Sequence, residues 1–124
     1  MEIDHPQTLA EVRAAFARYE EALNVNDVQT LNELFWRSPH TLRYGIAEEL
    51  YGHDAVAAFR SGRAAPGRRQ LGRVQITTYG RDFATASCEF RRQAGGLGRQ
   101  MQTWMRTPEG WRIVAAHVSV RDEK

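Results

Sequence analysis

The chain has 124 residues, a length typical of one domain, and we expect a single domain over residues 1–124. Its net charge is only +2 and acids are interspersed among most of the arginines, so we expect no nucleic-acid partner. Cys88 is the only cysteine, which excludes an internal disulfide and favours a reducing compartment. The first residues lack an export signal, and no run approaches about 20 apolar residues, so we expect a cytoplasmic protein without membrane contact.

Helical patterns fill the first half of the chain. Apolar residues at helical spacing predict a long amphipathic helix over residues 6–24, which Pro6 begins. A second, shorter helix is expected after Asn26, which can cap it, and residues 38–39 (Ser-Pro) end it. A third helix is predicted over residues 53–63, and Pro66 with the following glycine breaks it.

Strand patterns lie between the second and third of these helices and after the third. Residues 41–44 and 49–51 flank a glycine-containing turn and predict a short hairpin. Four longer strands, separated by short turns and therefore antiparallel, are expected around residues 70–79, 83–92, 98–106 and 111–120. This order predicts an α+β fold: a helical N-terminal half packed on a strongly curved antiparallel sheet, forming a cone with one pocket near the helices.

Alternation along the strands predicts which side chains face the helices. In the second long strand the inward set is Ala84, Ala86, Cys88 and Phe90. In the last strand, Val114, Ala116 and Val118 are expected to point inward, and His117 and Ser119 outward.

The facing of the third long strand depends on the loop that follows it. A three-residue loop at 108–110 turns Gln100, Gln102 and Trp104 inward, and a four-residue loop turns Met101, Thr103 and Met105 inward instead. The methionine set is a plain core, whereas the Gln/Trp set would give the pocket polar groups; we favour the Gln/Trp set.

The sequence offers few signals for a metal or cofactor. The four histidines are scattered and form no HxH or HExxH spacing, so no metal is expected. The glycines of residues 95–98 lie between two strands and fit a hairpin turn better than a phosphate loop, so no cofactor is expected. Arginines cluster around residues 60–73, and their planar forks suit an acidic small molecule.

Two side chains are candidates for the pocket. Tyr19 lies on the apolar stripe of the first helix, as a core tyrosine with a satisfied hydroxyl or as part of a site, while Glu20 and Glu21 fall off that stripe and are expected in solvent. Arg43 lies where the chain enters the sheet. It is either a surface arginine of an edge strand or an inward cation without a carboxylate, which would be costly until an anion binds.

Stretches along nearly the whole chain resemble the AtzH-like family, which includes the AtzH and HpxZ proteins of cyanuric acid and oxalurate catabolism. They are YEEAL (19–23), ND (26–27), LFW (34–36), TLRYG (41–45), ITTYG (76–80), GRQMQTW (98–104) and GWRIVAAHVS (110–119). The resemblance implies the ketosteroid-isomerase-like (SnoaL-like) cone. It also implies a decarboxylating amidohydrolase that converts 1,3-dicarboxyurea to allophanate and needs a tyrosine and an arginine, which correspond to Tyr19 and Arg43.

From this resemblance we expect Tyr19 and Arg43 to be catalytic and Gln102, Trp104 and Phe90 to shape the substrate pocket. The expected substrate is a small anionic amide or urea. The alternative function is a non-catalytic module that binds an acidic metabolite or a partner amidohydrolase. A homodimer or higher oligomer is expected through the outward sheet face, which carries Thr85, Ser87, Glu89, Arg91, His117 and Ser119.

Overall fold

The computed structural model describes residues 1–65 and 67–122 and begins with two helices. Helix α1 (Pro6–Val25) has Pro6 in its first turn, and His5 caps it by accepting a hydrogen bond from the backbone of Thr8. The role predicted for Asn26 is wrong: it ends α1 in a left-handed conformation, with φ of 55°. Asp27 instead caps helix α2 (Val28–Leu34), its Oδ1 accepting from the Thr30 amide at 3.1 Å.

The remaining elements are a hairpin, a helix and four long strands. They are β1 (Leu42–Tyr44), β2 (Glu49–Tyr51), α3 (His53–Gly62), β3 (Gln70–Tyr79), β4 (Phe83–Arg91), β5 (Leu97–Thr107) and β6 (Gly110–Arg121). These confirm the predicted order of elements. The helix break expected at Pro66 lies outside the described residues.

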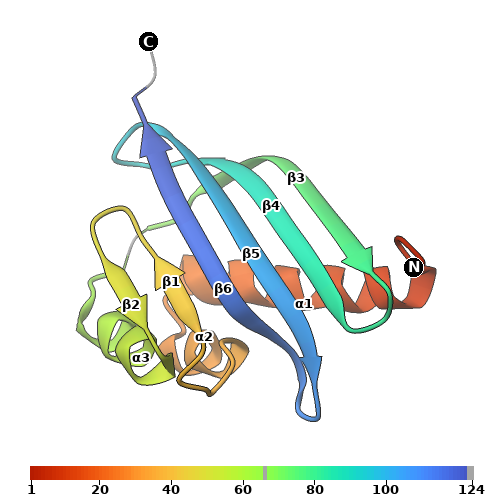
Figure 1. Cartoon of the computed structure of the whole chain (residues 1–124). Coiled ribbons are helices and arrows are strands. Elements are labelled where there is room, and N and C mark those ends of the chain that lie inside the picture. Colours follow the sequence, from red (N-terminus) through yellow and green to blue (C-terminus); the bar gives the residue numbers. More distant parts are fainter. Residues whose placement is uncertain (66, 123–124) are drawn as a thin grey trace.

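All strands join one six-stranded sheet in the order β2-β1-β6-β5-β4-β3 (Figure 1). The long strands pair antiparallel as predicted. The hairpin adds one pairing that the sequence did not indicate, because β1 lies parallel to β6, with Arg43 opposite Ala116. The sheet is therefore mixed, and this pairing carries Arg43 to the inner face of the sheet.

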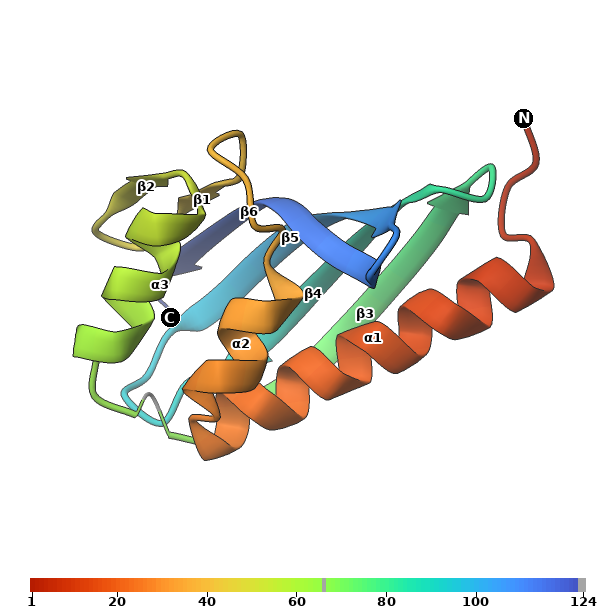
Figure 2. The ribbon, with the colours of Figure 1, turned by 90° about the horizontal axis from the view of Figure 1, so that it is seen from below.

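The helices cover one face of the curved sheet and leave the other open (Figure 2). Helix α1 crosses beneath the long strands, while α2 and α3 lie on the same side near β1 and β2. This is the predicted cone, with helices closing over the concave face of an open sheet. In the described part of the chain, no helix has both the length and the apolar character that crossing a membrane requires.

A bulge sets the register between β5 and β6. Thr107 pairs with Gly110, so the loop is shorter than either length considered above. The register then shifts between Thr103 and Trp104, after which Gln102 pairs with Ala116, as a three-residue loop would have required. The Gln/Trp set is confirmed as facing inward, since Gln102 and Trp104 are buried and Met101 is 59 % exposed.

The same bulge corrects the prediction for Val114. This residue is the extra one at the register shift and is only half-buried, and Ile113 takes its place in the core with no exposure. Ala116 and Val118 are buried, as predicted. In β4 the inward set is confirmed, because Ala84, Ala86, Cys88 and Phe90 are all buried.

Candidate functional site

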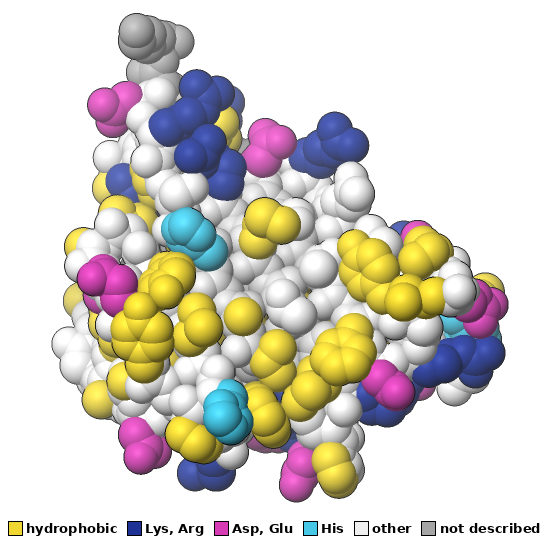
Figure 3. All heavy atoms as spheres, in the orientation of Figure 1, with side chains coloured by type: hydrophobic (Ala, Val, Ile, Leu, Met, Phe, Trp, Pro, Cys, Tyr) yellow, Lys and Arg dark blue, Asp and Glu magenta, His cyan; other side chains and the backbone are white. Residues whose placement is uncertain are grey.

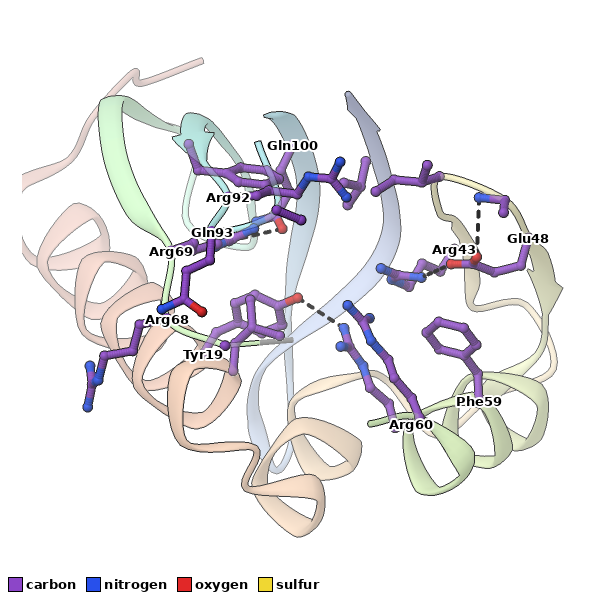
Figure 4. Close-up of a pocket in the computed structure, with 18 residues that line it drawn as sticks. Tyr19, Arg43, Glu48, Phe59, Arg60, Arg68, Arg69, Arg92, Gln93 and Gln100 are labelled. Carbon is purple, nitrogen blue, oxygen red and sulfur yellow. Dashed lines mark hydrogen bonds and ion pairs between the residues drawn. The ribbon is translucent and has the colours of Figure 1, made fainter. Parts of the chain in front are cut away.

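A cavity of about 430 Å³ lies between the C-terminal end of α1, helix α3 and the inner face of the sheet (Figure 4). The β1–β2 turn closes one side and the β4–β5 turn another. Six arginines contribute to its lining: Arg43, Arg60, Arg63, Arg68, Arg69 and Arg92. A second hollow of about 360 Å³ lies away from these residues, between the end of α2 and the β5–β6 turn.

Tyr19 and Arg60 meet in the middle of this cavity (Figure 4). The Tyr19 ring is held edge-on against Phe35, and its hydroxyl oxygen accepts a hydrogen bond of 3.1 Å from Arg60 Nη2. Both side chains are buried, with exposures of 2 % for Tyr19 and 3 % for Arg60. A guanidinium can only donate, so the Tyr19 hydroxyl hydrogen must point elsewhere and is available as a donor.

Arg43 approaches from the opposite side, paired with a carboxylate. Its Nη1 donates to Glu48 Oε1 at 2.8 Å, and Glu48 Oε2 accepts from the backbone amide of Ala47 in the same turn. Arg43 is 5 % exposed and thus points inward, the second of the two possibilities considered from the sequence, but Glu48 supplies the carboxylate that the inward alternative lacked. One contact to Glu48 leaves the other N–H groups of the fork free for a ligand.

The ring of Phe59 supports two of the cations. The guanidinium carbon of Arg43 lies 5.2 Å from its centroid and that of Arg63 lies 5.3 Å away. Burial, reinforced by the charge of Arg60, lowers the pKa of Arg43. Burial, and then the charges of Arg60 and Arg43, lower the pKa of Arg63. The three guanidinium groups therefore repel one another across the cavity.

Arg69 forms a separate, satisfied network on the other wall. It pairs with Glu20, donates to Gln100 Oε1 at 3.2 Å and lies 4.1 Å from the centroid of Phe90. Glu20 is thus buried, and the expectation that it is solvated is wrong, because Arg69 brings it a partner from outside the helix. Burial opposes the charge of Arg69, but the hydrogen bond and charge of Glu20 outweigh it and raise the pKa of Arg69.

The cavity wall carries buried donors that lack acceptors. Of the described residues that line the cavity, Arg60 and Gln100 each have a buried nitrogen without a hydrogen-bond partner, Nε in Arg60 and Nε2 in Gln100. Gln100 must turn its oxygen to Arg69, which cannot accept, so its amide nitrogen is the group left over. Unsatisfied buried donors are costly, and a ligand rich in acceptors would satisfy them.

Only some of the residues predicted for the site line the cavity. Tyr19, Arg43 and Phe90 all line the cavity. Gln102 and Trp104 are fully buried deeper in the cone and do not line it; Trp104 Nε1 donates to Gln102 Oε1 at 3.1 Å. Gln100, two residues before Gln102 on the same face of β5, is the member of the inward Gln/Trp set that lines the cavity.

Sequence reasoning missed Arg60 and Glu48 as individual site residues. A signal for Arg60 was present: it lies four residues after Val56 on the buried stripe of α3, where an arginine is unusual. Glu48 gave no such signal, because its contact with Arg43 depends on the shape of the β1–β2 turn. Within residues 1–65 and 67–122, no three side chains of the kinds that bind metals gather in one place.

Comparisons with known proteins identify the family and the fold. A family model described as AtzH-like matches residues 1–124. A crystal structure of a protein of unknown function from Pectobacterium atrosepticum is similar, with 53 % identity, a TM-score of 0.94, and coverage of 97 % of this chain and 95 % of that one. A cystatin-like fold protein from Burkholderia xenovorans has 50 % identity and a TM-score of 0.95, covering 100 % and 99 %.

More distant structures share the fold alone. An NTF2-like superfamily protein from Salmonella enterica has 24 % identity and a TM-score of 0.76, covering 95 % of this chain and 94 % of that one. No curated protein matches the sequence.

Proposed function

Because the chain belongs to the AtzH-like family, we propose that it is a metal-independent decarboxylating amidohydrolase acting on a small N-carboxylated urea, of the 1,3-dicarboxyurea to allophanate type. The observation that carries the proposal is the meeting of Tyr19, Arg60 and Arg43 in one cavity where, among the described residues, two buried N–H donors lack acceptors. Such a lining suits a planar molecule with carboxylate and carbonyl oxygens.

In this proposal Arg43 binds a carboxylate of the substrate. A charge-assisted hydrogen bond of this kind contributes on the order of 1.5 to 3 kcal/mol. Glu48 holds one arm of the guanidinium, which fixes its plane and directs the remaining N–H groups into the cavity. As a cation beside the substrate, Arg43 also stabilises the negative charge that develops on the nitrogen when the bond to the carboxyl carbon breaks.

Tyr19 supplies the proton that the reaction needs. The bond between one nitrogen and its carboxyl carbon breaks, the electron pair stays on the nitrogen, and the nitrogen takes the Tyr19 hydroxyl proton. The carboxyl group leaves as CO₂, which water converts to bicarbonate, and the tyrosinate regains a proton from water. Arg60, at 3.1 Å, stabilises the tyrosinate between these steps. General acid catalysis of this kind contributes about 10² to 10⁴ in rate.

The test is to supply purified protein with the dicarboxyurea that a partner amidase forms and to follow allophanate. Tyr19→Phe removes only the hydroxyl and should lower turnover by about 10² to 10⁴. Arg43→Ala should lower it as well, with a higher KM. Tyr44→Phe is the matched control, because the Tyr44 hydroxyl bonds Tyr51 on the outer face. Full turnover in both site variants would refute the assignment.

The rival function is a non-catalytic module that binds an acidic metabolite or the amidase itself. It predicts that the substrate disappears at the same rate with and without the protein. Size-exclusion chromatography with the amidase separates the two: co-elution with unchanged substrate supports the module, and turnover without co-elution supports the enzyme.

Association with a second copy stays a prediction. Apolar side chains are spread over the outer face of the sheet (Figure 3), among them Met101, 59 % exposed, Phe83, 50 % exposed, and Tyr51, 64 % exposed. Burying them in a homodimer would remove this surface from water. Sedimentation of the wild type and of Met101→Glu tests it, and a monomeric wild type would contradict it.

A further inference from the structure

The charges of the cavity are not all balanced. Arg43 pairs with Glu48, and Arg69 pairs with Glu20. Arg68 lies exposed, and Arg92 donates to the carbonyl of Gly95 in its own turn. Among the described residues, no carboxylate forms an ion pair with Arg60 or Arg63. Two positive charges therefore face the cavity without an ion-pair partner among the described residues.

These two cations lie close together in the chain, and both line the cavity. Arg60 lies in the last turn of α3, and Arg63 follows the helix directly as its C-cap. Arg60 is 3 % exposed and its Nε has no partner within residues 1–65 and 67–122, and Arg63 rests on Phe59 at 5.3 Å. An unpaired buried guanidinium is costly, and a bound carboxylate removes that cost.

We propose that Arg60 and Arg63 form a second carboxylate site in addition to Arg43, so that the cavity selects a dianion over a monoanion. This inference rests on the proposed function and extends it. The dicarboxyurea substrate carries two carboxylates, one at each end, and the two sites bind one end each. Loss of one carboxyl group leaves a monoanion that can fill only one site, so the product binds more weakly and departs.

The selectivity can be measured without any reaction. Glutarate has the same five-atom chain as the dicarboxyurea and two carboxylates, and glutaramate is the same chain with one end an uncharged amide. Neither probe carries a carbamate that could be lost. We expect calorimetric titration to give glutarate a Kd roughly tenfold to a hundredfold lower than that of glutaramate, as one charge-assisted contact would produce.

Two variants test whether Arg60 and Arg63 are responsible for this ratio of affinities. Arg63→Gln, at a half-buried position, should bring the ratio of the two Kd values close to one, and Arg60→Gln should do the same if thermal unfolding shows that it folds. Arg99→Gln is the control, because it removes an equal charge from the exposed outer face, where Arg99 bonds Ser119. It should leave the ratio unchanged.

The outcomes separate this inference from the proposed function. Equal affinity for both probes in the wild type, or an equal loss of both in Arg63→Gln, would overturn the second site. A wild-type preference for glutarate that Arg63→Gln abolishes supports it, even if the protein turns over no dicarboxyurea. Turnover that depends on Tyr19 without any preference for glutarate would keep the chemistry and remove the second site.

Discussion

The two ends of the concave face differ although the same strands build both. Toward one end, β5 contributes Trp104, fully buried opposite Ala84 and Ile113 in the neighbouring strands. Four residues earlier on the same face, β5 contributes Gln100, which lines the cavity and accepts a hydrogen bond from Arg69. The packed end stabilises the fold, whereas the cavity end carries cations that repel one another, which favours binding over stability.

The largest effect is expected at the packed end. Trp104→Ala should lower the free energy of unfolding by about 3 to 5 kcal/mol, because it leaves a cavity among side chains that cannot close it. Urea unfolding followed by circular dichroism measures the loss. Phe83→Ala, at an exposed position of the outer face, is the control and should change stability by only about 0.5 kcal/mol. A similar loss in both variants would show that the packed end contributes no more to stability than the outer face does.

The reactivity of Cys88, which is buried on the inward face of β4, tests whether solvent from the cavity reaches that strand. Burial is the main cause that raises the pKa of the Cys88 thiol to about 11. A raised pKa keeps the thiol neutral, so at pH 8 alkylation by iodoacetamide should be about a hundredfold slower than in urea. The rate should rise about tenfold per pH unit from pH 8 and level off near pH 11. Rapid alkylation of the folded protein at pH 8 would mean that the cavity opens onto β4.

Gly98, near the start of β5, allows the ring of Phe90 to lie directly against that strand. A Cβ at this position would lie 2.2 Å from the Phe90 ring, so Gly98→Ala must push that ring toward the cavity. Overpacking of this kind costs about 1 to 3 kcal/mol, and we expect weaker glutarate binding as well. Gly62→Ala, which meets nothing within 4 Å at the end of α3, is the matched control and should be neutral or slightly stabilising. Unchanged stability and binding in Gly98→Ala would show that Phe90 moves freely.

The smallest effect should have the opposite sign. Arg63→Met removes a cation that Arg60 and Arg43 repel and keeps the contact with Phe59, so the free energy of unfolding should rise by about 1 kcal/mol while glutarate binding falls. Arg99→Met should change neither. If Arg63→Met destabilises the protein instead, Arg63 has a structural partner and the cavity end is not strained.

The elements themselves were predictable because they depend on local pattern. Helical spacing, alternation and turn residues located all three helices and all six strands, and the inward set of β4 followed from a period of two. The predictions were wrong at residues whose local sequence is compatible with two backbone conformations. Asn26 can begin a helix or end one, and the bulge at Val114 cannot be read from alternation.

The sequence by itself determined an α+β cone with an inward Tyr19 and a basic character, because periodicity, turns and composition act over short distances. Only the tertiary structure decided which groups meet there. It joined Tyr19 to Arg60, 41 residues away, paired Arg43 with Glu48, buried Glu20 against Arg69, and put Gln100 rather than Gln102 at the cavity. These contacts depend on sheet curvature, on the β1–β6 pairing and on the position of α3, which no local pattern specifies.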